Sequence, residues 1–271
     1  MFKKTILAVA VATLALAQGV KAQTNLQVFY DFGKDRGHVT TTLEGFYPDS
    51  WGNTFFFVDH DFNNKLDDGK TIVSPNGTYM EIARCLNFWQ KVPVLNGFSL
   101  QVEYNGGIYN NFSINNAFLA GIDYFIHSKD FKNTLNLKVL YKWIDYRGVS
   151  SPFFPDYKLS SQVPLQFTLV WGLKDLFGLK GLSFSGFADF WWQDHILFTN
   201  EKGEDLLNEN GVFAPQLSHI EFISEPQLWY NVGQWIGVPN FNIGGEVELS
   251  FDFGSARGFW ARPCVGAKWV F

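Results

Sequence analysis

Apolar and polar side chains alternate along most of this chain. The alternation has a period of two residues, which is typical of β-strands with one apolar and one polar face. Turn-forming residues separate the alternating segments. The predicted strands are residues 26–32, 39–47, 53–62, 78–88, 98–105, 116–127, 134–146, 159–173, 182–192, 219–230, 241–253 and 259–271. No segment after Gln23 has a convincing helical period, so the pattern predicts an all-β chain of about 12 strands.

The last predicted strand shows what the two faces are for. Val265, Ala267, Trp269 and Phe271 share its apolar face, and Lys268 lies on the other. An apolar face backed by a charged one, ending on an aromatic residue, is typical of the closing strand of an outer-membrane β-barrel. The even number of strands puts both chain ends on one side, which we expect to be the periplasm. The fold class predicted is therefore a transmembrane antiparallel β-barrel of outer-membrane type.

The first 22 residues predict export from the cytoplasm. Lys3 and Lys4 precede an apolar run at 6–17, and Val20-Lys21-Ala22 is a small-residue cleavage site. We therefore expect residues 1–22 to be a secretory signal peptide and residues 23–271 to form a single barrel domain. The predicted location is the outer membrane of a Gram-negative bacterium, with membrane lipid around the barrel.

Composition agrees with interleaved apolar and polar positions. The chain has 29 Phe, 10 Trp and 10 Tyr, yet its mean hydropathy is only −0.05. Its 21 basic residues include three in the signal peptide, which leaves 18 basic against 26 acidic residues and a net charge of −8. Such a chain is a poor partner for nucleic acid. Cys85 and Cys264 fall on strands that are not neighbours, so we expect no disulfide between them.

The predicted inner faces combine carboxylates with aromatic rings. Rings can stack on a planar or sugar-like solute, and carboxylates can accept hydrogen bonds from its hydroxyl and amino groups. An acidic lumen would also repel anions. The candidate lumen residues are Phe29, Asp31, Phe55, Phe57, Asp59, Asp61, Glu81, Glu103, Phe187, Asp189 and Trp191. The alternative is that the carboxylates pair with inward basic residues, such as Glu246 with Lys268, and fill the lumen.

Other chemistry has weaker support in the sequence. The acidic stretch 59–69 departs from the spacing of a calcium loop, because Lys65 stands where a ligand is needed, so we expect neither a metal nor a cofactor. Ser218 and His219 would face opposite sides of one strand, and no GxSxG, GxGxxG or P-loop motif is present. We therefore expect no enzyme. A barrel enzyme acting on lipid or lipopolysaccharide through His219 or His127 remains the alternative.

Two residues conflict with a simple barrel pattern. Arg84 falls on the lipid-facing side, where it would cost about 2–4 kcal/mol at mid-bilayer. It is therefore expected near the membrane interface or at a β-bulge. Pro263 lacks a backbone donor inside the last strand, so we expect a bulge or fraying within residues 261–264.

Several segments together resemble the nucleoside-specific channel-forming outer-membrane proteins, the Tsx-like family, and a related branch of it with no assigned function. The resembling segments are 39–62, Met80-Glu81-Ile82, 182–194 and 265–271. The resemblance implies a monomeric barrel of 12 strands that passes nucleosides by weak binding along a narrow lumen. Unlike that family, this chain has its basic residue, Arg84, one place early, and Cys85 takes the inward position.

The resulting hypothesis is a passive outer-membrane channel for nucleosides or similar small polar solutes. The strand that ends at Phe271 is expected to be recognised by the barrel-assembly machinery. Two alternatives remain: the barrel enzyme already described, and a non-conducting structural or adhesion barrel.

Overall fold

The computed structural model describes residues 23–33, 36–62, 64–65, 71–72, 74–109, 113–147 and 151–271, so the predicted signal peptide lies outside the described residues. Most of the described chain is β-strand. The strands are β1 (Gln23–Asp31), β2 (His38–Asp49), β3 (Gly52–Phe62), β4 (Asn64–Lys65), β5 (Thr71–Ile72), β6 (Gly77–Leu86), β7 (Phe98–Tyr109), β8 (Ser113–His127), β9 (Asn133–Ile144), β10 (Leu165–Lys174), β11 (Leu182–Leu197), β12 (Gln216–Ser224), β13 (Gln227–Tyr230), β14 (Phe241–Phe253) and β15 (Ala256–Val270). The helices are η1 (Leu176–Gly178) and α2 (Gly233–Ile236).

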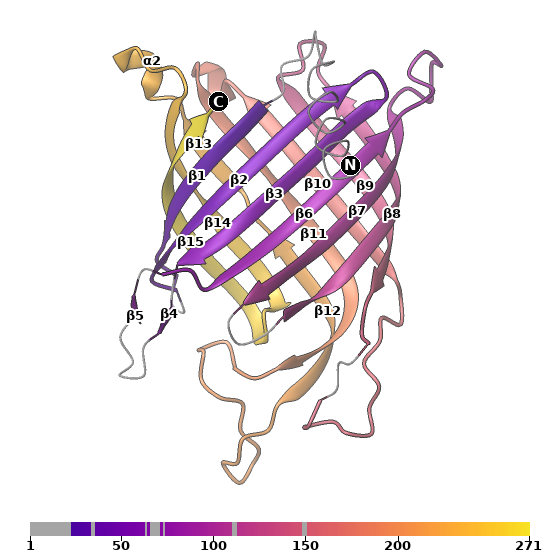
Figure 1. The fold of residues 1–271 in the computed structure, drawn as a ribbon, viewed down its shortest axis with the longest axis vertical. Helices are drawn as coiled ribbons and strands as arrows, with labels where there is room; N and C mark the ends of the chain where they lie inside the picture. The colour runs from indigo at the N-terminus through magenta and orange to yellow at the C-terminus, as the bar shows by residue number, and fades with distance from the viewer. Residues whose placement is uncertain are drawn as a thin grey trace, which may run out of the picture.

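The strands close into an antiparallel barrel. Each wall strand pairs with its neighbours in sequence, and β1 pairs with β15 through Leu26 opposite Trp269. β12 and β13 lie end to end between β11 and β14 and form one stave. They are separated at Pro226, which has no amide hydrogen for the ladder. The predicted barrel of 12 strands is therefore confirmed, and its tilted strands are seen in Figure 1.

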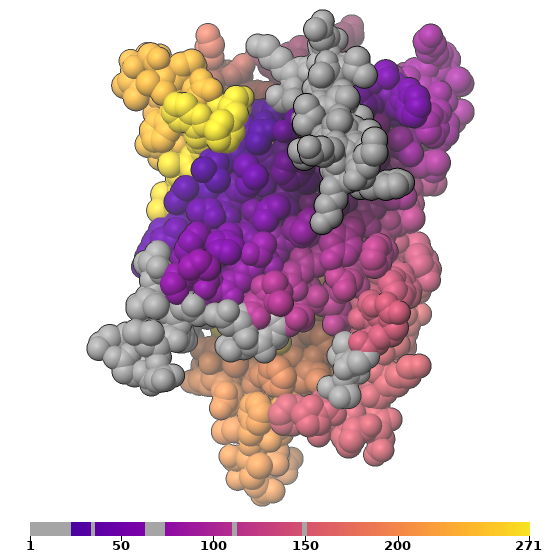
Figure 2. Space-filling view, viewed as in Figure 1, coloured from indigo at the N-terminus to yellow at the C-terminus, as the bar shows by residue number. Residues whose placement is uncertain are grey.

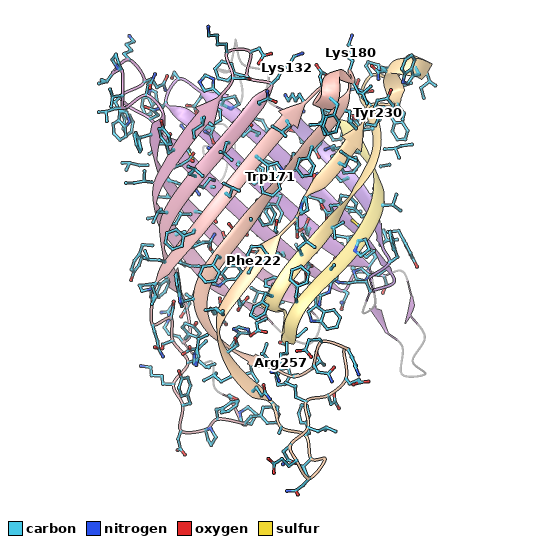
Figure 3. The ribbon with its side chains drawn as sticks, turned by 180° about the vertical axis from the view of Figure 1, so that it is seen from behind. Lys132, Trp171, Lys180, Phe222, Tyr230 and Arg257 are labelled. Carbon is cyan, nitrogen blue, oxygen red and sulfur yellow. The ribbon has the colours of Figure 1, made fainter. Side chains whose placement is uncertain are left out.

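The wall has an apolar outer surface. Along β1, the buried residues Asn25, Gln27 and Phe29 alternate with exposed apolar ones. Figure 3 shows Trp171 and Phe222 on the wall between the two rims. Many large apolar side chains around the outside are 40–60 % exposed, far more than a soluble protein leaves open. Such a belt is what contact with lipid requires.

The two ends of the barrel differ. One end, here called the short-turn end, holds the connections 50–51, 87–97, 128–132, 175–181 and 231–240 together with the C-terminus. The opposite end, the long-loop end, holds β4 and β5 and the connections 145–164 and 198–215. Figure 2 shows the connection 198–215, in orange, projecting beyond the wall. Residues 106–115, which lie between two predicted strands, are mostly strand, because β7 runs to Tyr109 and β8 begins at Ser113.

The predicted start of the strand at Leu159 is wrong. The strand expected from Leu159 begins at Leu165, since the preceding residues turn aside toward the end of β11. There the Ser160 carbonyl accepts a hydrogen bond from the Asp194 amide (3.0 Å), and the Ser161 hydroxyl bonds the Trp192 carbonyl (2.6 Å). This segment therefore belongs to the long-loop end.

Arg84 lies at the short-turn end, which agrees with the first of its two predicted placements, near the membrane interface. Its guanidinium pairs with Asp49, the last residue of β2, at 2.7 Å. The arginine thus sits at the rim and avoids the cost of mid-bilayer burial.

The bulge expected at Pro263 is absent. β15 continues through Pro263, which stands opposite Val247 in unbroken register. The Pro263 carbonyl accepts a hydrogen bond from Phe32, the residue just after the end of β1. Because the amide and carbonyl of one strand residue point the same way, the missing donor faces the side where β1 has ended. The irregularity in this hairpin lies instead between Phe251 and Phe253.

Within the ranges that the structure describes, no helix is both long and apolar enough to cross a membrane.

Candidate functional site

The candidate site is the lumen, and its walls carry the predicted residues. On β3 and β6 the register places Phe57 beside Glu81 and Asp59 beside Tyr79. Ring centroids lie 6.1 Å apart for Phe55 and Phe57 and 5.9 Å apart for Phe57 and Tyr79. Phe55, Phe57 and Asp59 on β3 form one continuous surface with Tyr79 and Glu81 on β6, and each of these five residues is half-buried. Asp61, farther along β3, is buried.

Two predicted aromatic residues are packed away from open space. Phe29 is 2 % exposed and lies 5.6 Å from the ring of Trp229, with Cys264 in the same cluster. Trp191 is 6 % exposed and lies under the ammonium of Lys142, 3.9 Å from its ring centroid. The prediction that these two rings stack on a solute is not supported by their burial, whereas Phe187 on β11 is half-buried.

The lumen also contains an apolar cluster that the sequence pattern did not predict. Leu119 on β8 and Leu140 on β9 are 2 % and 0 % exposed, and they pack with Ala117 and Ile144. These residues stand on the inner side of their strands, between outward residues such as Val139. That part of the barrel interior is therefore packed with apolar side chains.

Asp31 and Asp61 share partners near the long-loop end. The Thr40 hydroxyl lies 2.9 Å from an oxygen of each carboxylate. The imidazole Nε2 of His38 lies 3.3 Å from Asp31 and 4.0 Å from Asp61. These two predicted residues therefore belong to a bonded cluster at one end of the lumen.

The basic residues of the lumen are held by specific partners. Arg262 donates to Glu248 at 2.6 Å, and Arg36 binds the other oxygen of the same carboxylate at 2.6 Å. Lys268 lies over the ring of Trp229, 4.2 Å from its centroid. The pairing suggested for Glu246 with Lys268 is not made, because Glu246 accepts a hydrogen bond from the Gln227 amide at 2.7 Å.

Sequence reasoning missed some of these partners. Arg36 follows the first hairpin turn and reaches back over the long-loop end, so the strand pattern assigns it no face. Tyr79 donates its hydroxyl to Glu81 at 2.6 Å. The inward register of residues 78–88 was a signal that could have identified Tyr79.

Six of the inward carboxylates that make no ion pair with a described residue are grouped as the acidic ring. They come from β3, β6, β7, β11, the β12–β13 junction and β14. They are Asp59, Glu81, Glu103, Asp189, Glu225 and Glu246. Glu44 and Asp123 also make no such ion pair, but they accept hydrogen bonds from the Asn25 and Asn136 amides.

The hydrogen bonds to the ring carboxylates come from neutral groups. Asp59 accepts from the Thr42 hydroxyl at 2.5 Å and Glu81 from the Tyr79 hydroxyl. Glu103 accepts from the Gln101 amide at 2.6 Å and Glu246 from the Gln227 amide.

The acidic ring spans the lumen from wall to wall. Glu225 interacts electrostatically with Asp59 and Glu246 and also with Glu81. Glu81 interacts in turn with Glu103 and Asp189. The sequence placed each residue on an inner face, but the electrostatic contact between opposite staves arises only when the barrel closes.

A second polar cluster lies at the long-loop end. Asp194 is buried, and its carboxylate accepts the Nδ1 side of the exposed His219 imidazole at 2.6 Å. Its other oxygen accepts from the Tyr157 hydroxyl at 3.1 Å and the Ser160 amide at 2.9 Å. Ser218 turns away, and its hydroxyl donates to Asp252 at 2.8 Å. As predicted from strand geometry, Ser218 and His219 do not form a pair.

The other residues considered for chemistry do not converge. Asn231 lies at the short-turn end, where its amide bonds the Pro239 carbonyl at 2.7 Å. Asn63 and residues 66–70 of the acidic stretch lie outside the described residues. Among the residues that the structure does describe, no three His, Cys, Asp or Glu side chains are arranged to hold a metal ion. Cys85 and Cys264 are buried free thiols.

Comparisons with known proteins give a family. The family model described as "Domain of unknown function (DUF5020)" matches residues 22–271. No curated protein matches the chain.

The solved structures similar to this chain include a porin and two outer membrane phospholipases. The NanC porin has 8 % identity and a TM-score of 0.46, with 91 % of this chain and 98 % of that one covered. Outer membrane phospholipase A from Escherichia coli has 11 % identity and a TM-score of 0.44, with 92 % and 96 % covered. The calcium-bound phospholipase dimer from Salmonella typhi has 12 % identity and a TM-score of 0.43, with 92 % and 90 % covered. Similarity this remote transfers no activity.

Proposed function

The chain belongs to the DUF5020 family, and we propose that it is an outer-membrane channel for passive diffusion of nucleosides or similar small polar solutes. The observation that carries the proposal is the half-buried surface of β3 and β6. It presents Phe55, Phe57, Asp59 and Glu81 to the lumen of a closed barrel. The exposed apolar belt around the wall supports a place in the outer membrane of a Gram-negative bacterium.

The chemistry of this surface suits a nucleoside. A base is planar and can stack on a phenyl ring, and the ribose hydroxyls can donate hydrogen bonds to carboxylates. A nucleotide carries phosphate charge, which the carboxylates repel.

The proposal extends to how the barrel is made. Lipid of the outer membrane would cover the apolar belt, and the assembly machinery would recognise the strand that ends at Phe271. The Phe271 amide donates to the Thr24 carbonyl at 2.9 Å, beside the seam where β15 meets β1. A single chain closes the barrel, which favours a monomer.

Planar-bilayer recording tests the function. The conductance should be partly blocked by adenosine or thymidine and much less by the corresponding nucleotides. Phe57→Ala should weaken the nucleoside block, since its ring faces the lumen. The matched control is Phe56→Ala, which removes the neighbouring ring on the outer face of the same strand. Equal block by nucleosides and nucleotides, or none, would refute the nucleoside assignment.

A second candidate is a barrel enzyme acting on lipid or lipopolysaccharide. The observation that favours it is the exposed His219 imidazole, which the buried Asp194 carboxylate orients through Nδ1. A histidine held in this way can serve as a general base. The test is hydrolysis of phospholipid or lipopolysaccharide by the refolded protein. Turnover that His219→Ala abolishes, without pore current, would establish the enzyme and refute the channel. Neither current nor turnover would leave a structural barrel.

A further inference from the structure

We infer that the acidic ring binds organic cations that carry more than one amino group. This inference deepens the proposed channel function by naming a class of solute, and it rests on that function only for transport. Binding itself can be tested separately.

The first observation is that no basic side chain in the described part of the chain forms an ion pair with a carboxylate of the ring. The ion pairs within 4.0 Å among the described residues involve Arg36, Arg84, Arg147, Arg257, Arg262, Lys132 and three histidines. None of these pairs includes a carboxylate of the ring. The ring carboxylates accept hydrogen bonds from hydroxyl and amide groups, which are neutral. Lys138, Lys142 and Lys268 interact electrostatically with the ring from a distance. Several carboxylates held together with no cation in contact are still unfavourable, and a bound cation would relieve the repulsion.

The second observation is an unpartnered atom. Asp189 is only 9 % exposed, and its Oδ1 has no hydrogen-bond partner. Lys142 is near enough to interact electrostatically, but it donates its hydrogen bond to Gln166 at 2.8 Å and lies over Trp191. A buried carboxylate oxygen without a donor is uncommon and costly. An ammonium group, which has three donors and no acceptor, would satisfy it.

The third observation is the spread of the ring. Its carboxylates come from six places around the wall, and none of them belongs to a group of three ligand-type side chains close enough for a metal ion. This arrangement suits a ligand with charges several atoms apart. Phe57 lies beside Tyr79 next to the ring, and the faces of such rings attract alkylammonium groups. Rings of acidic side chains are also how cation channels select their ions.

Spermidine is the probe for the first experiment, in planar bilayers. The wild-type channel should be selective for potassium over chloride in a salt gradient, and micromolar to millimolar spermidine should block it. Glu225→Gln/Glu246→Gln removes two charges at nearly constant volume and should weaken the block about tenfold or more, which corresponds to ~1.4 kcal/mol. The control, Glu201→Gln/Glu209→Gln, removes two charges from an exposed loop and should leave both properties unchanged.

The second experiment measures binding without current. Spermidine should raise the unfolding temperature of the refolded barrel in detergent, whereas 1,4-butanediol and sodium chloride of equal ionic strength should not. The shift should be smaller in Glu225→Gln/Glu246→Gln and unchanged in the loop control. Migration of unboiled samples on a denaturing gel shows that each variant is folded.

The two proposals fail in different ways. A spermidine shift without any current supports the acidic ring as a site and refutes the channel. Current with a nucleoside block, but with neither potassium selectivity nor a spermidine shift, supports the channel and overturns the cation site. Equal shifts in the ring variant and the loop control also overturn it, because the effect would then be unspecific.

Discussion

The lipid-facing belt makes a quantitative prediction at Val139. This residue is 49 % exposed on the outer face of β9 and pairs with Ile122 and Phe167. It lies six residues after Asn133 and five before Ile144, the ends of the strand. With a rise of about 3.4 Å per residue and a tilt of about 40°, those ends are about 16 Å and about 13 Å away along the barrel axis. Val139 is therefore close to the bilayer midplane.

Val139→Arg should lower the free energy of unfolding by about 2–4 kcal/mol, because the charge would enter hydrocarbon. Ile126→Arg is the matched control. Ile126 is 42 % exposed on the outer face of β8, next to the last residue of that strand, where arginine costs about 0–1 kcal/mol. Urea unfolding from phospholipid vesicles measures both variants. Equal losses at the two positions would refute the membrane depth assigned here.

Three further predictions concern other parts of the barrel. Arg262→Met should lower the free energy of unfolding by about 2 kcal/mol. This is less than the roughly 3–5 kcal/mol usual for a broken buried ion pair, because Arg36 still binds Glu248. A double-mutant cycle with Glu248→Gln measures the coupling energy. Gly266→Ala should lower the free energy of unfolding by about 1–3 kcal/mol, because a Cβ there would lie 2.6 Å from the ring of Phe29. Unfolding in urea measures this loss. The hydrogen bond from Lys132 holds the pKa of Asp175 below its ordinary value. Its stabilisation is therefore present above about pH 4 and lost as the pH falls, so Asp175→Asn should narrow the stability difference between pH 6 and pH 3.

Strand number, strand direction and the two faces of the wall could be predicted because lipid outside and a polar lumen inside impose a strict two-residue alternation. Leu137 and Val139 against Lys138 show the rule on one strand. The same alternation placed each carboxylate of the acidic ring on an inner face. It could not show that Glu225 interacts electrostatically with Asp59 on the far side of the lumen, because the strand pattern has no information about distances between opposite strands.

Packing inside the lumen was decided by the tertiary structure. Phe29 and Phe57 have the same local pattern, yet Phe29 is enclosed by Trp229 and Phe57 is not. Arg36 comes from a turn and finds Glu248 from far along the chain. The faces of the strands follow from the sequence alone, since they depend only on neighbouring residues. Lumen carboxylates bind arginine, amide and hydroxyl groups. Which of these a carboxylate binds depends on the strands that the closed barrel brings close together.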